Sequence, residues 1–408
     1  MKCRHCASPL QKVFLDLGFA PPSNAYVSPA GLSTPELYFP LKLFVCDSCW
    51  LVQTQDFARS DELFTDEYAY FSSVSSTWLA HAARYCDDIA ARLDLGPESL
   101  VVEIAANDGY LLKNFVEAGI PCLGIEPTAS TAAAAERIGV PTLREFFGLE
   151  LGQRLTAQGR QADLIVGNNV YAHVPDINDF TAGLKAALKP TGTITLEFPH
   201  LARLIEHTQF DTVYHEHFSY LSLFTVSRIF TAAGLRVFDV EQLSTHGGSL
   251  RVYGCHLDDP RQQSGAVRDV LALEERTGLQ QPGVYKAFQA RADVVKDGLL
   301  QFLLEQKRAG RSVAAYGAAA KGNTLLNYAG VKPDLLAFVC DGAPSKQGRF
   351  LPGSHIPILP PEALAERRPD VVLILPWNLA AEVVQQNTAV RQWGGRFYVA
   401  VPGVREVP

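Results

Sequence analysis

Apolar and polar positions along this chain change their spacing several times. Residues 41–45 are apolar at four of five positions and predict a strand, whereas the turn-rich stretch 17–24 before them is not expected to be regular. Apolar side chains recur at helical spacing between residues 77 and 93, which predicts an amphipathic helix. From residue 99 onward short apolar runs alternate with helical patterns, which is typical of parallel sheets with crossover helices.

The alternation occurs twice, with a helical region between its two copies. The first copy predicts strands at 100–104, 121–125, 164–167 and 192–198. It predicts helices at 110–118, 129–138, 147–158 and 178–187. Residues 261–309 are largely helical with a break at Pro282-Gly283, and the second copy predicts strands at 312–316, 335–340, 371–375 and 396–401. We therefore expect an α/β protein with an N-terminal module (1–62), a Rossmann-like domain (63–258) and a second Rossmann-like domain (259–408).

Composition and charge narrow the class of protein. The 408 residues are 47% hydrophobic and 19% charged, which fits a globular chain of two to three domains and not a disordered one. The net charge of -7 argues against binding to nucleic acid or anionic lipid. No apolar run approaches the roughly 18 residues of a membrane span, and residues 1–6 show no apolar signal region. We expect no nucleic-acid or membrane partner, and the separate domains are compatible with a monomer.

The eight cysteines are unevenly spaced, and four of them form two C-x-x-C pairs, namely Cys3, Cys6, Cys46 and Cys49. A secreted disulfide scaffold would be short and dense in cysteine, so this usage favours the cytoplasm. A redox C-x-x-C would not need a second pair, whereas two pairs supply the four thiolates of a tetrahedral Zn²⁺ site. Four protein ligands leave no open coordination position, so we expect the zinc to be structural.

The segment 101–112 contains a strand, a turn of small residues and the start of a helix, an arrangement that lets a ligand approach backbone amides. Glu126, at the tip of the next strand, is placed to bind two ribose hydroxyls. The turn has a single glycine in place of G-x-G-x-x-G and the acidic Glu103 before it, which favours S-adenosylmethionine over a dinucleotide; an ordinary βα turn is the alternative. The candidate cofactor residues, including two after the strand at 164–167, are Glu103, Ala105, Asn107, Gly109, Tyr110, Leu111, Glu126, Asn168 and Asn169.

Histidines gather in one part of the chain. Seven of the ten lie between residues 173 and 256, namely His173, His200, His207, His215, His217, His246 and His256. The densest stretch, 211–220, does not match H-E-x-x-H, and three adjacent ligands on a regular element could not face one metal ion, so a second metal site is disfavoured. Acid–base chemistry fits better: His217 as a base, Glu216 to orient its ring and Tyr214 to donate to an oxyanion. A set of satisfied core residues is the alternative.

Several longer motifs follow one another in a fixed order. They are the paired C-x-x-C module, E-I-x-x-N-D-G-Y-L at 103–111, N-N-V-x-A-H at 168–173, Y-H-E-H at 214–217, H-G-G-S-L-R at 246–251, Y-G-A-A-A-K-G at 316–322 and K-Q-G-R-F-L-P-G at 346–353. On these motifs the chain resembles, over essentially its full length, the three-domain S-adenosylmethionine-dependent nucleotide-sugar C-methyltransferases, a family that includes the 3-C-methyltransferase of the tetronitrose pathway.

The resemblance implies roles for individual residues. His217 would be the general base, with Tyr214 and Glu216 beside it and His173 near the sugar. A tyrosine after the zinc module, Tyr68 or Tyr70, would close the site, and the zinc would be structural. The last domain would bind the nucleotide sugar at the helix that opens after Gly317, and the candidate contacts there are Gly317, Lys321, Asp341, Lys346 and Arg349; a purely structural last domain is the alternative.

The predicted activity is therefore transfer of a methyl group from S-adenosylmethionine to C3 of a nucleoside-diphosphate 4-keto-deoxyhexose, for deoxysugar biosynthesis. A 4-keto group acidifies the C3 proton, and the enolate left by deprotonation attacks the sulfonium methyl group. TDP, GDP and CDP sugars, and a methylated carbon other than C3, stay open. The alternatives are an NAD(P)-dependent nucleotide-sugar oxidoreductase, against which the glycine-poor turns argue, and a non-catalytic zinc scaffold that binds S-adenosylmethionine or S-adenosylhomocysteine, against which the histidine cluster argues.

Overall fold

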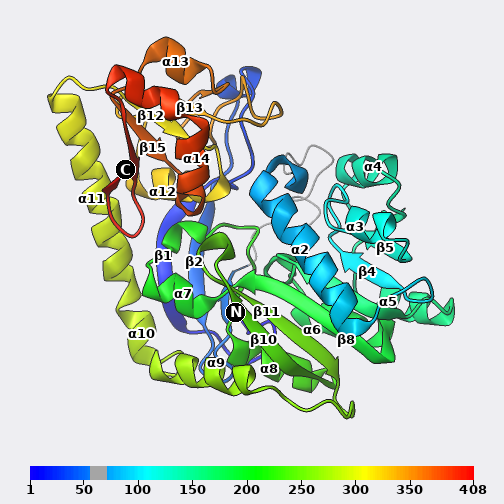
Figure 1. Cartoon of the computed structure of the whole chain (residues 1–408). Helices are drawn as coiled ribbons and strands as arrows, with labels where there is room; N and C mark the ends of the chain where they lie inside the picture. The colour runs from blue at the N-terminus through cyan, green and yellow to red at the C-terminus, as the bar shows by residue number, and fades with distance from the viewer. Residues whose placement is uncertain (56–70) are drawn as a thin grey trace.

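The computed structural model of the chain describes residues 1–55 and 71–408 and contains three sheets surrounded by helices (Figure 1). The predicted α/β class is confirmed, because the two larger sheets consist mainly of parallel strands joined by helices. In the described part of the chain, no helix is both long and apolar enough to cross a membrane.

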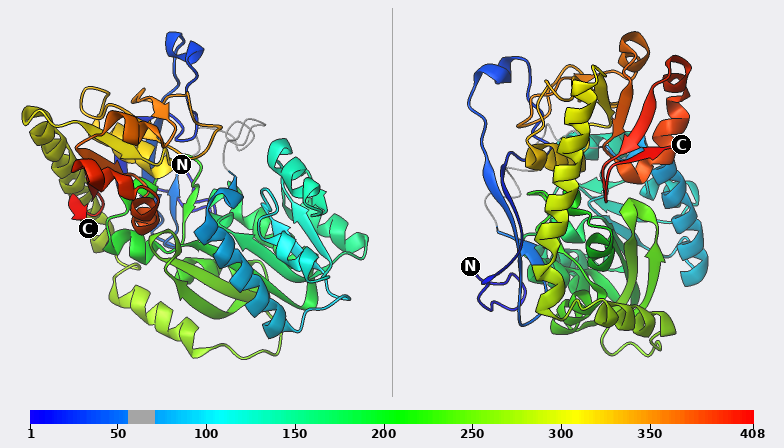
Figure 2. Two further views of the ribbon diagram at one scale, coloured as in Figure 1. Left: turned by 45° about the horizontal axis from the view of Figure 1, so that its top comes forward. Right: turned by 90° about the vertical axis from the view of Figure 1, so that its left-hand side faces the viewer.

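The N-terminal sheet has four antiparallel strands in the order β1(Lys12–Ala20), β2(Phe39–Val45), β3(Val52–Thr54) and β9(Ser219–Tyr220). The predicted strand at 41–45 lies within β2. The expectation of irregular structure from residue 17 is wrong in part, because β1 continues to Ala20 through a bulge at which Gly18 adopts a φ of 74°. The connection from β1 to β2 contains the 3₁₀ helix η1(Ala30–Ser33) and projects from the body of the molecule (Figure 2).

The strand β9 comes from a distant part of the chain. It directly follows the Y-H-E-H segment and pairs with β3, where Tyr220 lies opposite Val52. The amide of Thr54 also donates to the carbonyl of Phe218 at 3.1 Å. The N-terminal sheet therefore holds the histidine-rich segment in place.

The central sheet has seven strands in the order β10(Leu235–Leu243), β11(Ser249–His256), β8(Leu188–Pro199), β7(Ala162–Asn168), β4(Val101–Ile104), β5(Cys122–Ile125) and β6(Thr142–Leu143). Strands β4 to β8 are parallel, and β4, β5, β7 and β8 match the four predicted strands, whereas the two-residue β6 was not predicted. The parallel sheet predicted for residues 99–200 is confirmed, and β10 and β11, which were not predicted, add an antiparallel edge to it. Their pattern is obscured by charged side chains such as Asp239 and Arg251, which serve a buried ionic network.

Helices cover both faces of the central sheet. They are α2(Ser76–Leu93), α3(Leu112–Glu117), α4(Ala129–Arg137), α5(Leu149–Ala157), α6(Ile177–Ala187), α8(Leu223–Ala232) and α9(Gly265–Arg276). The short helix α7(Leu201–Glu206) after β8 packs instead in the hydrophobic cluster of the N-terminal sheet. The predicted helix at 77–93 is confirmed as α2, which begins where the Ser75 side chain accepts from the amide of Trp78 and ends at the left-handed Asp94.

The C-terminal sheet has the order β14(Ile358–Leu359), β13(Val339–Cys340), β12(Val313–Tyr316), β15(Val371–Ile374), β16(Arg396–Val399) and β17(Arg405–Val407), parallel except for β17. Its helices are α10(Pro282–Lys286), α11(Phe288–Arg308), α12(Ala320–Ala329), α13(Ala363–Arg367) and α14(Ala380–Gln386). The predicted break at 282–283 is the start of α10, where proline occupies the first turn. The predicted strand at 335–340 is confirmed only at its end, as β13.

The N-terminal module shares its hydrophobic core with both other parts. Leu15 and Leu41 pack in one buried cluster with Leu326 and Val339 of the C-terminal domain. The helix α9 packs against β10 of the central sheet and against α8. Its Glu274 accepts from the amides of Leu223 and Phe224 at the start of α8. The boundaries at residues 62 and 258 stay predictions, and α9 packs on the domain before the second of them.

Candidate active site

A cavity of about 490 Å³ lies at the carboxyl ends of the central strands and extends to the start of α12. Open α/β sheets bind ligands at this edge. The cavity brings together twelve of the residues predicted from the sequence, which come from the central and C-terminal parts of the chain. They are Ala105, Asn107, Tyr110, Glu126, Asn168, Asn169, His173, Tyr214, Glu216, His217, Lys321 and Lys346.

The turn after β4 has an unusual backbone. Ala105, Asn107 and Gly109 all adopt positive φ values, of 57°, 49° and 77°. A Cβ atom on Gly109 would lie 3.1 Å from side-chain atoms of Ala135 and Val140, so this glycine lets the turn pack against α4. Gly109 and the buried Leu111 support the turn from behind and do not line the cavity.

The carboxylate of Glu126 holds this turn from the tip of β5. Its oxygens accept from the amides of Asn107 and Thr128, each at 2.9 Å. A carboxylate has about four acceptor positions, so two remain for a hydrogen-bond donor in the cavity. Glu103 differs, because it is 1% exposed and lies outside the cavity; burial, followed by the charges of Glu126 and Asp108, raises the pKa of Glu103 well above its ordinary value.

Two asparagines follow β7. The side-chain oxygen and nitrogen of Asn168 are both buried and have no hydrogen-bond partner among the described residues, although the residue lines the cavity. Buried polar atoms of this kind are satisfied in most proteins, so a polar ligand fits here. Asn169 has a φ of 55°, and its Nδ2 lies 3.1 Å from Nε2 of His246.

His217 is buried and oriented by a backbone carbonyl. Its Nδ1 lies 3.0 Å from the carbonyl oxygen of Thr212, and because a carbonyl only accepts, this nitrogen carries the proton. Nε2 is then the nitrogen with the lone pair. Burial, followed by the charge of His173, lowers the pKa of His217 well below its ordinary value, so the ring is neutral near pH 7.

Aromatic and acidic neighbours surround His217. Its ring centroid lies 4.0 Å from that of Tyr214 and 4.5 Å from that of His173. Burial lowers the pKa of His173 to about 4. Both oxygens of Glu216 accept from Nδ2 of Asn24 in the N-terminal module, at 2.8 and 2.9 Å, whereas the ring of His217 is oriented by the carbonyl of Thr212.

The C-terminal domain contributes two lysines. Nζ of Lys321, at the start of α12, donates to Oδ1 of Asn378 at 2.6 Å and lies 4.7 Å from the ring centroid of Trp377. Nζ of Lys346 donates to the carbonyl of Ala318 at 2.9 Å. Burial lowers the pKa of Lys321, although the charge of Asp211 opposes this shift.

Three predicted contacts of this domain lie outside the cavity. Gly317 has a φ of 89°, and a Cβ atom on it would overlap Pro376, so its role is to let the two loops approach. The oxygens of Asp341 accept from the amides of Ala318 and Ala343, at 2.7 and 2.8 Å. Arg349 is half-buried and also does not line the cavity. Tyr68 and Tyr70 lie outside the described residues.

Several cavity residues were not predicted from the sequence as site residues. Asn24, Trp78 and His246 all line the cavity, as does Phe146. Trp78 belongs to the apolar pattern of α2 and looks like a core residue. His246 was noted in the histidine-rich segment, and its motif H-G-G-S-L-R was the one available signal.

The two C-x-x-C pairs come together at the N-terminus. The four sulfur atoms of Cys3, Cys6, Cys46 and Cys49 all lie within 4.8 Å of one another, and the pairs Cys3–Cys49 and Cys6–Cys46 are each separated by 3.5 Å. Tetrahedral zinc with Zn–S bonds of about 2.3 Å places its sulfurs about 3.8 Å apart. The donor set therefore fits a structural zinc ion.

Comparisons with known proteins agree with this geometry. Family models match a zinc binding domain at residues 3–64, a methyltransferase domain at 78–240 and a C-methyltransferase C-terminal domain at 244–402. The C-methyltransferase NovU of Streptomyces niveus is 34% identical over 406 residues, which cover 100% of this chain and 96% of NovU. A ubiquinone biosynthesis O-methyltransferase of Rhodopseudomonas palustris is 26% identical over 152 residues, or 32% of this chain and 60% of that protein.

Solved structures are more distant. The magnesium protoporphyrin IX methyltransferase of Synechocystis PCC 6803, with bound S-adenosylmethionine, aligns with 44% of this chain and 81% of its own, at 15% identity and a TM-score of 0.34. A likeness at this level carries no argument about function.

The fold, the turn after β4 and the matched central domain define an S-adenosylmethionine-dependent methyltransferase with an N-terminal zinc-binding domain. The chain belongs to the C-methyltransferase family that includes NovU.

Proposed function

We propose that this enzyme methylates C3 of a nucleoside-diphosphate 4-keto-deoxyhexose in deoxysugar biosynthesis. The supporting observation is the position of His217, a neutral base in the same cavity as the cofactor turn and the lysines of the C-terminal domain. The proposal also takes the resemblance of the ordered motifs to sugar C-methyltransferases as support.

His217 would remove the proton from C3. Its Nδ1–H stays on the Thr212 carbonyl, so Nε2 accepts the proton and the ring becomes a cation. The electron pair of the C3–H bond passes into the enolate, whose oxygen would accept a hydrogen bond from Tyr214. S-adenosylmethionine, when bound, supplies the methyl group that C3 takes from sulfur. His217 then returns its proton to solvent.

The two lysines would bind the diphosphate of the substrate. Lys321 and Lys346 line the cavity, and ammonium groups form charge-assisted hydrogen bonds with phosphate oxygens. His173 lies beside His217 and would face the sugar, while Tyr68 or Tyr70 would close the site. Gly317, Asp341 and Arg349 would support the loops that carry the lysines.

The cofactor would bind along the turn after β4. Glu126 would accept from the ribose hydroxyls, and Asn107, Asn168 and Asn169 would contact polar groups of the amino-acid part. We place the reaction in the cytoplasm, where thiols stay reduced and four cysteines can hold zinc. The chain is proposed to act as a monomer.

A mass-spectrometric assay tests the proposal. The purified protein receives S-adenosylmethionine with TDP-, GDP- or CDP-linked 4-keto-deoxyhexoses, each with hydrogen or deuterium at C3. The expected result is a product one methyl group heavier that has lost the C3 isotope, and the accepted sugar identifies the nucleotide. Cofactor binding without methylation of any sugar would overturn the substrate assignment. Oxidation of added NAD(P)H by the 4-keto sugar, without methyl transfer, would favour the oxidoreductase alternative.

A further inference from the structure

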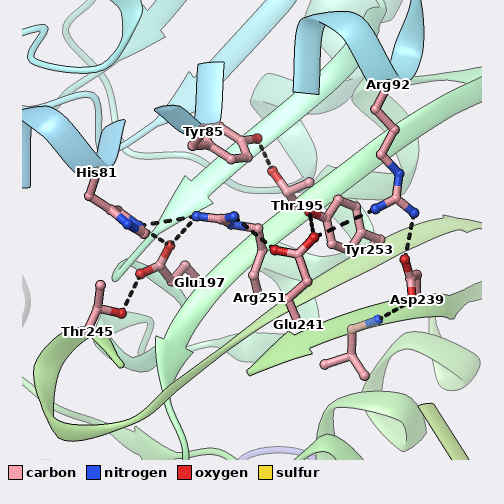
Figure 3. Close-up of polar contacts among 11 residues, drawn as sticks. His81, Tyr85, Arg92, Thr195, Glu197, Asp239, Glu241, Thr245, Arg251 and Tyr253 are labelled. Atoms are coloured by element: carbon pink, nitrogen blue, oxygen red, sulfur yellow. Dashed lines mark hydrogen bonds and ion pairs between the residues drawn. The ribbon is translucent and has the colours of Figure 1, made fainter. Parts of the chain in front are cut away.

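Behind the cavity wall, a buried ionic network joins α2 to the antiparallel edge of the central sheet (Figure 3). Its centre is Glu197 near the end of β8, whose side chain is 0% exposed. Its Oε2 accepts from Nη2 of Arg251 at 3.0 Å and from Nε2 of His81 at 2.9 Å. Its Oε1 accepts from Oγ1 of Thr245 at 2.9 Å. Hydrogen bonds thus reach this carboxylate from three different segments.

The charges alternate across the sheet. Arg251 on β11 also contacts Glu241 at 3.2 Å, and Arg92 near the end of α2 contacts Asp239 at 2.6 Å (Figure 3). Burial opposes the charge on Glu197, but the hydrogen bond from His81 and the charges of His81 and Arg251 hold the pKa of this carboxyl below its ordinary value. The group is therefore an anion, and a buried anion needs every one of its partners.

His81 connects Glu197 to the cavity through α2. The ring of His81 stacks on that of Trp78, one turn earlier, with centroids 4.9 Å apart and planes 20° from parallel. Trp78 lines the cavity and stacks in turn on Tyr110 of the cofactor turn at 6.0 Å. The position of His81 thus determines where the Trp78 ring lies.

The second and third connections reach the cavity at His246 and Asn169, and the His246 ring lies 5.1 Å from that of Trp78. Thr245 directly precedes His246, a cavity residue held in a left-handed conformation with a φ of 53°. The backbone carbonyl of Glu197 accepts from the amide of Asn169 at 2.7 Å, and Asn169 contacts His246 through its side chain. The side chain of Glu197 therefore supports Trp78 and His246, and its backbone carbonyl supports Asn169.

We propose that Glu197 is a positioning residue for the cofactor: it does not touch the ligand but holds the first turn of α2, the turn at 245–247 and the tip of β7 at the spacing that S-adenosylmethionine requires. The inference rests on the proposed placement of the cofactor along the turn after β4. It does not depend on the identity of the sugar.

The test compares affinities for S-adenosylhomocysteine, measured by calorimetry without any sugar. Glu197→Gln keeps the size of the side chain and removes its charge. Because small misplacements of binding groups have large effects, the dissociation constant should rise about tenfold or more. Thr245→Val removes one hydrogen bond and should raise it about threefold with a small fall in the melting temperature, whereas Thr245→Ser keeps the hydroxyl and should bind as the wild type does.

Glu274→Gln is the matched control. Glu274 is also 0% exposed and paired with a histidine, His200, at 2.7 Å, but it lies outside the cavity. This variant should lose stability and keep its affinity within about twofold, since its hydrogen bonds hold α8 and not the ligand.

Wild-type affinity in Glu197→Gln, or an equal loss in Glu274→Gln, would overturn the inference. If Glu197→Gln does not fold, Thr245→Val decides, and unchanged affinity in that variant would overturn it. If Glu197→Gln loses affinity as expected but the wild-type enzyme methylates no sugar, the role of Glu197 stands and only the proposed substrate is wrong.

Discussion

The turn after β4 and the turn after β12 use the same local arrangement for different purposes. Glu126 accepts from an amide of the first turn, that of Asn107, and from the amide two residues after itself. Asp341 does the same with Ala318 of the second turn and with Ala343. In both domains an acidic residue at the tip of a neighbouring strand closes the turn.

The surroundings of the two carboxylates differ. Glu126 lines the cavity, whereas Asp341 does not and lies 3.4 Å from Lys346. Pro376 lies against Gly317 and covers the second turn. An acidic residue at a strand tip is therefore not enough to identify a nucleotide site. The first turn is open to a ligand, while the second fixes the loops that carry Lys321 and Lys346 into the same cavity.

The largest expected effect in this comparison is at His217, which lies in the cavity shared by the turn after β4 and the lysines of the C-terminal domain. Replacement of His217 by Asn removes the base between them, so kcat should fall by about 10²–10⁴-fold. The affinity for S-adenosylhomocysteine should not change, because the cofactor binds to the first turn. Turnover assays and calorimetry measure the two quantities separately.

His215 provides the control for this variant. It lies two residues from His217 but outside the cavity, with its ring 6.0 Å from that of Phe39. His215→Asn should keep kcat within a few-fold of the wild-type value. Equal losses in the two variants would show that the segment matters only for folding.

A pair of matched substitutions tests the two turns directly. Glu126→Gln should weaken binding of S-adenosylhomocysteine by about 10–100-fold, since hydrogen bonds to charged groups contribute about 1.5–3 kcal/mol. Asp341→Asn should leave this affinity within about twofold and lower the melting temperature instead. Similar losses of affinity in both variants would break the comparison.

A variant of Lys321 tests whether the C-terminal domain binds the diphosphate of the nucleotide sugar. Lys321→Met keeps the aliphatic stem and removes the charge, so KM for the nucleotide sugar should rise about tenfold through loss of a charge-assisted hydrogen bond. The affinity for S-adenosylhomocysteine should stay within about twofold. An unchanged KM would contradict the placement of the diphosphate beside this helix.

The smallest expected effect concerns pH. His217 must be neutral to accept a proton, and burial lowers its pKa well below 6.5. Activity should therefore be retained as pH falls through 6.5 and be lost only as pH reaches the lowered pKa. An unperturbed histidine would lose half of its activity near pH 6.5. A profile of kcat/KM between pH 5 and 8 separates the two cases.

The fold was predictable where the apolar pattern is regular, and less so where polar groups are buried. Strands β4, β5, β7 and β8 follow from short apolar runs. Strands β10 and β11 do not, because Asp239, Glu241 and Arg251 interrupt the pattern to form the network around Glu197. The strand β9 has two residues and exists through its pairing with β3.

The site was predictable where its residues are adjacent in the sequence. Tyr214 and His217 lie in one short segment and share the cavity. Asn24 and Trp78 reach it from distant segments and carry no local signal. Gly317 lies outside the cavity, where Pro376 from a later loop packs against it, and this contact between distant segments has no local signal in the sequence.

The central claim is that His217 removes a proton from the carbon that receives the methyl group. The most direct measurement is deuterium incorporation into the 4-keto sugar nucleotide in D₂O, with S-adenosylhomocysteine in place of the methyl donor. The wild-type enzyme should introduce one deuterium next to the ketone, and His217→Asn should not do so above the uncatalysed rate. Exchange by His217→Asn at the wild-type rate would contradict the account.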